Sequence, residues 1–405
     1  MTFVASSVPL CGYKGVVVVV PTRNRAHIAR NAIRSVLDEE IENVHVLVSD
    51  NSTVASDREA LADFCTSLDD ARLRYLRPPQ SFAMPEHWQW AIEQALSAYE
   101  VDHFLYLTDR MMFKRGGLGE VVKLAALYPD KVISYNHDRI VDHVKPIRVE
   151  HYPATALLWE IPTERLSWLV SQSVFHHGLP RMLNCIVPRA ILNRVQTRFG
   201  NVFASIAPDF NFCFRCLDLE DSILFLDKSP FFHYALGRSN GASVSRGEMT
   251  PDNADFTANL PVDDSIRNYA TPIPQLNTTV NAVLNEYLIY KNETNSPRFF
   301  DLDFEKYLAT NAMEVQEVTD PRLRAEMNAL LEKHGYRDAH GNQGLLQRAR
   351  SAVRKLKTPV GLVGEISIKF STVEAALDYA RTSSRMTPQS PDAVRELLHA
   401  RELPS

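Results

Sequence analysis

The stretch VVVVVPTRNRAHIARNAIRSVL, Val16 to Leu37, decides the fold. It begins with a run of five valines, which is typical of a strand buried on both faces of a parallel sheet. Residues 26–37 then carry apolar side chains at helical spacing, and Val44 to Val48 is a second strand-like run. Two parallel strands with a crossover helix predict an open α/β sheet, which binds ligands at the carboxyl ends of its strands.

Three polar segments follow strand-like runs, and we expect them to meet in one crevice. The third run is Phe104 to Leu107. The segments are Pro21-Thr22, Asp50-Asn51 and Thr108-Asp109-Arg110.

The composition is that of a globular protein with room for two domains. The chain has 405 residues, of which 45% are hydrophobic and 23% charged, and its formal net charge of −5 argues against a general nucleic-acid binder. The valine run is too short for a membrane span or a secretory signal, so we expect a cytoplasmic protein. Cys213 and Cys216 form CFRC inside an apolar helical run without a second pair at zinc spacing, which favours two buried helix thiols.

Strand-like and helical pieces alternate up to about residue 245, and helical patterns follow. We therefore predict an α/β domain over 1–245 and a mainly helical C-terminal domain over 246–405, with a role in acceptor binding, membrane-surface contact or oligomerisation. Residues 345–357 form a basic amphipathic pattern, which indicates either contact with an anionic membrane or a helix packed on its own domain.

Two groups of motifs resemble a known family. VVVVVPTRNRAHIARNAIRSVL followed by VHVLVSDNST resembles the opening of the inverting family 2 glycosyltransferases with the GT-A fold. MPEHWQWAIEQA followed by HFLYLTDR is similar to the family's helix, strand and acid-cluster segment. The resemblance extends over about residues 15 to 245, and it implies a Rossmann-like nucleotide-diphospho-sugar transferase domain.

The strand ends have the polar groups that a nucleotide sugar needs. A carboxylate such as Asp50 can accept from a base N–H or a ribose hydroxyl, and Asn51 and Thr22 can reach the same nucleoside. The alternative is that Asp-Asn-Ser only forms a turn and a helix cap. Arg25 and Arg238 are candidates for diphosphate contact, and each is as readily explained as a solvated surface charge.

The acid cluster that the resemblance implies is depleted here. Its metal-binding positions correspond to Asp109, Arg110 and Met111, and a methionine cannot replace a hard oxygen ligand for Mg²⁺ or Mn²⁺. Three hypotheses follow: Arg110 neutralises the leaving diphosphate without a metal, Asp109 holds a divalent ion with help from His233, or the site binds a nucleotide sugar without catalysis. The alternative for His233 is a hydrogen-bonded structural histidine.

An inverting transfer also needs a general base. Asp209 follows Pro208 at the start of a predicted helix, where the resemblance places the base carboxylate. The alternative is a helix-terminal acid that is stabilised by the helix dipole. The pair His176-His177 and the run Asn136 to Asp138 are candidate acceptor contacts or structural residues.

The sequence thus predicts a glycosyltransferase that moves a sugar from a nucleotide-sugar donor to a hydroxyl of a glycan or lipid-linked acceptor, at the inner face of a membrane. The competing interpretation is a catalytically inactive nucleotide-sugar binding module with a helical interaction domain. A nucleotidyltransferase is disfavoured because no glycine-rich phosphate loop follows the first strand.

Overall fold

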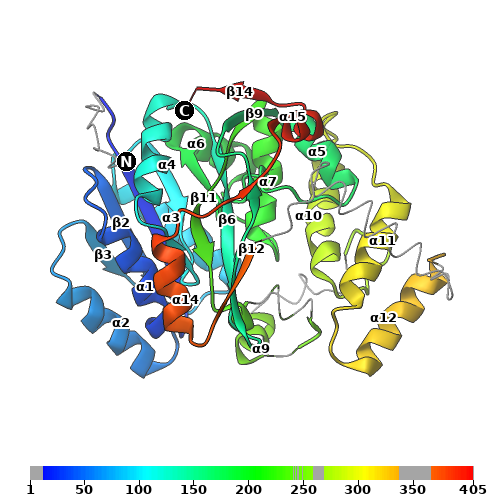
Figure 1. Ribbon diagram of the computed structural model, residues 1–405, viewed down its shortest axis with the longest axis horizontal. Coiled ribbons are helices and arrows are strands. Elements are labelled where there is room, and N and C mark those ends of the chain that lie inside the picture. The colour runs from blue at the N-terminus through cyan, green and yellow to red at the C-terminus, as the bar shows by residue number, and fades with distance from the viewer. Residues whose placement is uncertain are drawn as a thin grey trace.

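The computed structural model describes residues 12–239, 241, 243, 246–248, 250–258, 269–336 and 366–404. A mixed sheet with the strand order β14-β9-β11-β6-β10-β4-β1-β2-β3 forms its centre (Figure 1). The strands are β1 (Val16–Thr22), β2 (Val44–Asp50), β3 (Leu73–Leu76), β4 (His103–Tyr106), β5 (Met111–Phe113), β6 (Ile133–Val141), β7 (Ile147–His151), β8 (Pro153–Ala154), β9 (Leu158–Pro162), β10 (Cys185–Pro188), β11 (Ser222–His233), β12 (Ile366–Phe370), β13 (Thr387–Pro388) and β14 (Arg401–Leu403).

The helices alternate with the strands along the first half of the chain, as the sequence predicts. They are α1 (Ala26–Leu37), α2 (Ala55–Ser67), α3 (Met84–Ala98), α4 (Gly117–Leu127), α5 (Thr163–Ser171), α6 (Arg189–Phe199), α7 (Pro208–Leu219), the 3₁₀ turn η1 (Leu236–Arg238), α9 (Pro251–Ala258), α10 (Thr279–Thr294), α11 (Phe304–Val315), α12 (Pro321–Lys333), α14 (Val373–Thr382) and α15 (Pro391–Leu398).

The valine run of β1 is buried on both faces, as expected for a central parallel strand. Val16, Val18 and Val20 pack in one hydrophobic cluster, together with residues of α1, α2 and α4. Val17 and Val19 pack in a second cluster, with residues of α3, α6 and α7. Because side chains alternate along a strand, the two clusters lie on opposite faces of the sheet. β3, β2, β1 and β4 are mutually parallel, and β10 is antiparallel to β4.

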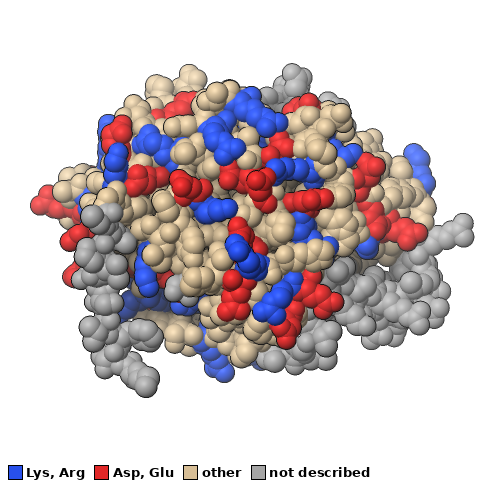
Figure 2. Space-filling view, turned by 90° about the horizontal axis from the view of Figure 1, so that it is seen from above, with Lys and Arg blue, Asp and Glu red and all other residues tan. Residues whose placement is uncertain are grey.

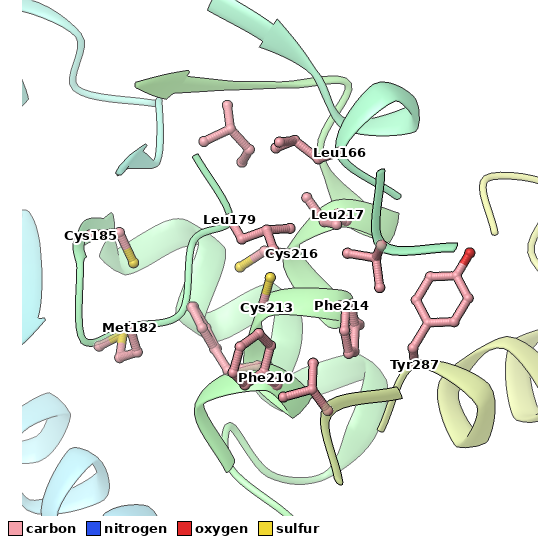
Figure 3. Packing of buried hydrophobic residues seen from close by; sticks show 14 of the residues in the cluster. Leu166, Leu179, Met182, Cys185, Phe210, Cys213, Phe214, Cys216, Leu217 and Tyr287 are labelled. Carbon is pink, nitrogen blue, oxygen red and sulfur yellow. The ribbon is translucent and has the colours of Figure 1, made fainter. Parts of the chain in front are cut away.

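The CFRC motif belongs to the core. Cys213 and Cys216 are free thiols without solvent exposure on α7, and burial raises the pKa of both. Figure 3 shows their sulfur atoms among apolar side chains, with Phe214 on the same helix facing Tyr287 of α10. The prediction of buried helix thiols is confirmed.

The C-terminal region is mainly helical, as predicted, and it also returns to the sheet. Helix α10 packs against α7, and the α10–α12 helices form one side of the molecule (Figure 1). β12 then pairs antiparallel with β7, and β14 with β9. Helix α14 lies beside α1, where Arg381 forms an ion pair with Asp38. The boundary near residue 245 stays a prediction.

The surface carries both signs of charge. Figure 2 shows basic and acidic side chains interspersed over the face seen from above. Within the described ranges, no helix combines the length and the apolar character that a bilayer span requires. The basic pattern at 345–357 lies outside the described residues.

Candidate active site

The three polar strand ends meet at one edge of the sheet. The parallel register of β1 and β2 places Thr22 opposite Asp50, and the amide of Asn51 donates to the Thr22 carbonyl at 3.0 Å. The amide of Leu107 donates to Val19 at 2.9 Å, which brings the segment after β4 beside β1. The three segments that the sequence predicts to meet therefore lie together at one edge of the sheet.

Asp109 is buried at this edge and bonded within the protein. Its Oδ2 accepts a hydrogen bond from the Thr22 hydroxyl at 2.9 Å, and its Oδ1 lies 3.4 Å from Nη1 of Arg25. Nη2 of Arg25 donates to the carbonyl of Arg238 at 2.9 Å. Arg25 thus links the segment after β4 to the turn η1, which places η1 next to the polar strand ends.

Arg238 is part of η1. Its guanidinium is 3.5 Å from Nε2 of His27, and it lines a cavity of 450 Å³ together with Tyr234 of the segment after β11 and Leu377 of α14. Its role as a diphosphate contact stays a prediction.

Asp50 and Asn51 hold neighbouring segments in this structure. Asp50 has no solvent exposure, and its oxygens accept from the Ser52 amide at 2.9 Å and the Tyr75 hydroxyl at 2.8 Å. The side chain of Asn51 donates to the Phe82 carbonyl at 2.8 Å and accepts from the Phe82 amide at 3.1 Å. Both residues therefore hold the segments that flank the strand ends, and their contact with a nucleoside stays a prediction.

A second arginine at this edge, Arg23, is not singled out by any pattern in the sequence. Arg23 donates to Ser81 at 2.8 Å and to the carbonyl of Phe82 at 3.1 Å. Its Nε also lies 2.6 Å from Asp255 of α9. Arg23 therefore fastens both the 81–82 loop and α9 to the end of β1.

The segment after Asp109 turns directly into β5. The amide of Met111 donates to the carbonyl of Thr108 at 3.0 Å, and the carbonyl of Arg110 accepts from the Tyr234 amide at 3.0 Å. Met111 pairs with His233 of β11 and is 1% exposed. The thioether of Met111 thus belongs to the core, and Arg110 and His233 are brought together at the end of β11.

Three imidazole rings cluster next to Arg110. The ring of His137 stacks on His177 with a centroid separation of 4.5 Å, and it lies 4.5 Å from the ring of His233. Burial lowers the pKa of His233 far below its usual value, and the charges of Arg110 and Arg181 act in the same direction. The pKa of His137 is also far below its usual value, chiefly through burial. Both rings are therefore neutral near pH 7.

Few ligands for the divalent ion that the family resemblance implies lie around Asp109 in the described residues. Both oxygens of Asp109 are engaged by Thr22 and Arg25, and Met111 is in the core. In the part of the chain that the structure describes, no group of three or more His, Cys, Asp or Glu side chains is placed to hold a metal ion. Metal binding by Asp109 and His233 stays a prediction.

The candidate base Asp209 stands in the first turn of α7, directly after Pro208. Proline suits that position because it has no amide hydrogen to leave unsatisfied. The carboxyl group is half-buried, and burial raises its pKa, while the nearby Arg181 acts in the opposite direction. Asp209 is thus a carboxylate whose proton affinity is higher than in water, as a general base requires.

Arg181 joins the base to the histidine cluster, and sequence reasoning missed it. Its guanidinium lies 5.5 Å from the ring centroid of Phe210, next to Asp209, and its charge also lowers the pKa of His137 and His233. It ends the stretch HHGLPR, which has no helical or strand periodicity, so nothing in the sequence singles it out.

The other candidate acceptor residues divide into two groups. His177 belongs to the ring cluster, and its Nδ1 is hydrogen-bonded to Asn136. Asp138 is bonded to Lys114 and to His151, each at 2.6 Å, and is 2% exposed. His176 accepts from the Gly178 amide at 2.9 Å, and burial lowers its pKa to about 4. Asp138 and His176 therefore have structural partners here.

Residues 17–179 match the sequence profile of the family described as Glycosyl transferase family 2. No curated protein sequence matches the chain significantly. Among solved structures, S. aureus TarS 1–349 in complex with UDP-GlcNAc matches with 12% identity and a TM-score of 0.43, over 84% of this chain and 81% of that one. Mannosyltransferase PcManGT from Pyrobaculum calidifontis, in complex with GDP-Man and Mn²⁺, matches with 12% identity and a TM-score of 0.40, over 86% and 88%.

TM-scores this low do not identify a fold by themselves. The profile match covers β1 to β4 and the acid-cluster position, where the parallel strands and the crevice are found. The sheet order and the mainly helical C-terminal region agree with the architecture that the sequence predicts. The part of the chain that holds the parallel strands, residues 17–179, is therefore similar to Glycosyl transferase family 2.

Proposed function

We propose that this enzyme transfers a sugar with inversion from a nucleoside diphosphate donor to a hydroxyl group of a glycan or lipid-linked glycan, with Asp209 as the general base. The observation that carries the proposal is the position of Arg181. Its charge acts on Asp209 on one side and on His233, beside Arg110, on the other. These charge effects support the proposal that the candidate base and the candidate diphosphate site belong to one active site.

In this mechanism, Asp209 accepts the proton of the acceptor hydroxyl as its oxygen attacks the anomeric carbon. A bond forms between that carbon and the acceptor oxygen, and the bond to the diphosphate oxygen breaks on the opposite side. The configuration inverts because attack and departure occur on opposite faces of the sugar. The diphosphate leaves with the bonding electron pair, so negative charge develops at the far end of the crevice.

We propose that guanidinium groups, and not a metal ion, neutralise this charge. The side chain of Arg110 follows Asp109 directly and lies close enough to His233 to lower its pKa. A guanidinium makes two parallel hydrogen bonds to phosphate oxygens, which suits a leaving diphosphate. The commitment of both Asp109 oxygens to Thr22 and Arg25 supports the metal-free hypothesis.

The acceptor is proposed to lie on the side of the histidine cluster, at the cytosolic face of a membrane. Tyr152 and His177 present rings with a centroid separation of 4.9 Å, and the guanidinium of Arg139 is 5.4 Å from the ring of Tyr152. Flat rings of this kind can pack against a sugar.

The test is the release of nucleoside diphosphate from a panel of nucleotide sugars, without an acceptor, by the wild-type protein and by Asp209→Asn. Slow transfer to water by the wild type alone supports a catalyst with Asp209 as its base. Binding of a donor without release by either protein would support the inactive binding module instead.

A further inference from the structure

Glu286 of α10 is a fully buried carboxyl group that the transfer mechanism leaves unexplained. Its Oε1 accepts from the Ser205 hydroxyl at 2.6 Å and lies 3.4 Å from the Ala207 amide. Its Oε2 lies 3.4 Å from the side-chain nitrogen of Asn211. These partners precede and follow Asp209 in the chain, so Glu286 holds the segment that carries the candidate base from both sides.

The segment before α7 depends on these contacts. Ser205 has a φ of 64°, a left-handed conformation that serine rarely adopts. Ala207, the N-cap residue of α7, has no side-chain group that could cap the helix. Glu286, on α10, therefore supplies the hydrogen-bond acceptor that no side chain within this turn provides.

The contact with Asn211 is compatible with a proton on Glu286. Oδ1 of Asn211 is buried without a hydrogen-bond partner, while its side-chain nitrogen faces Oε2 of Glu286. The oxygen and nitrogen of an amide are assigned from their partners, so the amide can be turned over. Oδ1 then faces Oε2, and a proton on Glu286 satisfies it. In that orientation Oε2 of Glu286 donates to Asn211, while Oε1 accepts from the Ser205 hydroxyl.

The charged surroundings agree with a neutral Glu286. Burial raises its pKa to about 8, and Asp209 acts in the same direction. The other titratable groups near it are Tyr269 and Arg215. Arg215 does not pair with Glu286, because its guanidinium donates to Asn201 and to the carbonyl of Val202.

We propose that Glu286 is a positioning residue of the active site, kept protonated so that it can hold the Ser205–Asn211 segment and place Asp209 for proton abstraction. The proposal rests on the assignment of Asp209 as the base. It makes α10, in the C-terminal region, a part of the catalytic apparatus. A protonated Glu286 also avoids a second negative charge near Asp209.

The first test compares kcat and KM of Glu286→Gln and Glu286→Ala with the wild type. Glutamine keeps the shape and the neutral charge, so we expect a kcat within about threefold of the wild type. Alanine releases the turn, and we expect a kcat reduced about 10- to 100-fold with the KM for the donor unchanged, because a small misplacement of a reacting group costs rate. Leu284→Ala, which empties a buried site on the same helix, is the matched control and should keep its kcat.

A loss of kcat in Leu284→Ala equal to that in Glu286→Ala would reduce Glu286 to a general structural role and overturn the proposal. Equal losses in Glu286→Gln and Glu286→Ala would also contradict it, because they would mean that an ionised carboxylate is required.

The second test measures the protonation state of Glu286 and needs no activity assay. Since the folded pKa is raised from 4.5 to about 8, the folded protein keeps a proton that the unfolded chain loses, and this part of the stability declines as pH rises through that window. We expect the melting temperature of Glu286→Gln to decline less over this window than that of the wild type, and the infrared band of a protonated carboxyl group to be weaker. An unchanged slope and band would overturn the protonation claim even if Asp209→Asn were inactive. Full activity of Asp209→Asn would instead show that Asp209 is not the base. Glu286 would then have no base to position, whatever its protonation state.

Discussion

The hydroxyl group of Thr22 donates to Oδ2 of Asp109 across 2.9 Å, joining the ends of β1 and β4. The two residues are 87 positions apart in the chain. Arg25 approaches the other carboxylate oxygen, so a hydroxyl and a guanidinium together hold the side chain of Asp109 in place. The acid that remains of the cluster thus acts inside the protein as a link between strand ends.

Thr22→Val tests this link. The substitution leaves one oxygen of a buried carboxylate without its donor, so we expect the free energy of unfolding to fall by about 1–3 kcal/mol. Denaturant titration measures the change. Thr66→Val removes an exposed hydroxyl on α2 and should change stability by less than about 0.5 kcal/mol. Equal stability of Thr22→Val and the wild type would show that the Thr22–Asp109 bond contributes nothing.

Arg110→Ala tests charge neutralisation without a metal. A charge-assisted phosphate contact contributes about 1.5–3 kcal/mol, so we expect affinity for nucleoside diphosphate in EDTA to fall about 10- to 100-fold. Affinity for the nucleoside alone should be unchanged, as calorimetry can determine. Arg115→Ala, an exposed arginine in the turn after β5, is the control. A matching loss with the nucleoside would mean that the substitution damages the whole crevice.

A thermal-shift panel of nucleoside diphosphates and nucleotide sugars tests the same claim on the unaltered protein. We expect one nucleotide to raise the melting temperature in EDTA, with no further gain from manganese, because guanidinium groups supply the positive charge. Stabilisation that requires manganese would assign Asp109 to a metal after all.

His87 makes part of the stability dependent on pH. It is buried against Ser49 at 2.7 Å, and burial lowers its pKa from 6.5 to about 3. In this window the unfolded chain binds a proton that the folded protein does not, so stability is lost as pH falls below 6.5. Between pH 6.5 and about pH 5 this amounts to about 2 kcal/mol. Over this pH range, we expect the free energy of unfolding to fall by about 2 kcal/mol less in His87→Gln than in the wild type. Denaturant titrations at each pH measure the difference. Parallel losses in the two proteins would contradict a neutral His87.

The sequence predicts the parts of the site that depend on local pattern. The valine run, the helix after it and the polar residues at the strand ends are separate periodic signals, and parallel pairing alone brings Thr22, Asp50 and Asp109 together. Arg181 and Glu286 could not be predicted in this way, because their importance arises from tertiary packing against α7. The one available sign for Glu286 was an acid among buried neighbours on a helix, at NAVLNEYLIY.

Depletion of the acid cluster is visible in the sequence, and its consequence is not. Met111 could be excluded as a ligand from its chemistry. The partners of Asp109 come from β1 and from the residue just before α1, so they follow only from the folded sheet.

The most direct measurement is the rate of nucleoside diphosphate release from the preferred nucleotide sugar by Asp209→Asn, in EDTA, with donor affinity measured on the same preparation. Loss of a general base predicts a rate reduced about 10²- to 10⁴-fold at nearly unchanged affinity. Turnover close to that of the wild type would contradict Asp209 as the base and, with it, the account of the active site given above.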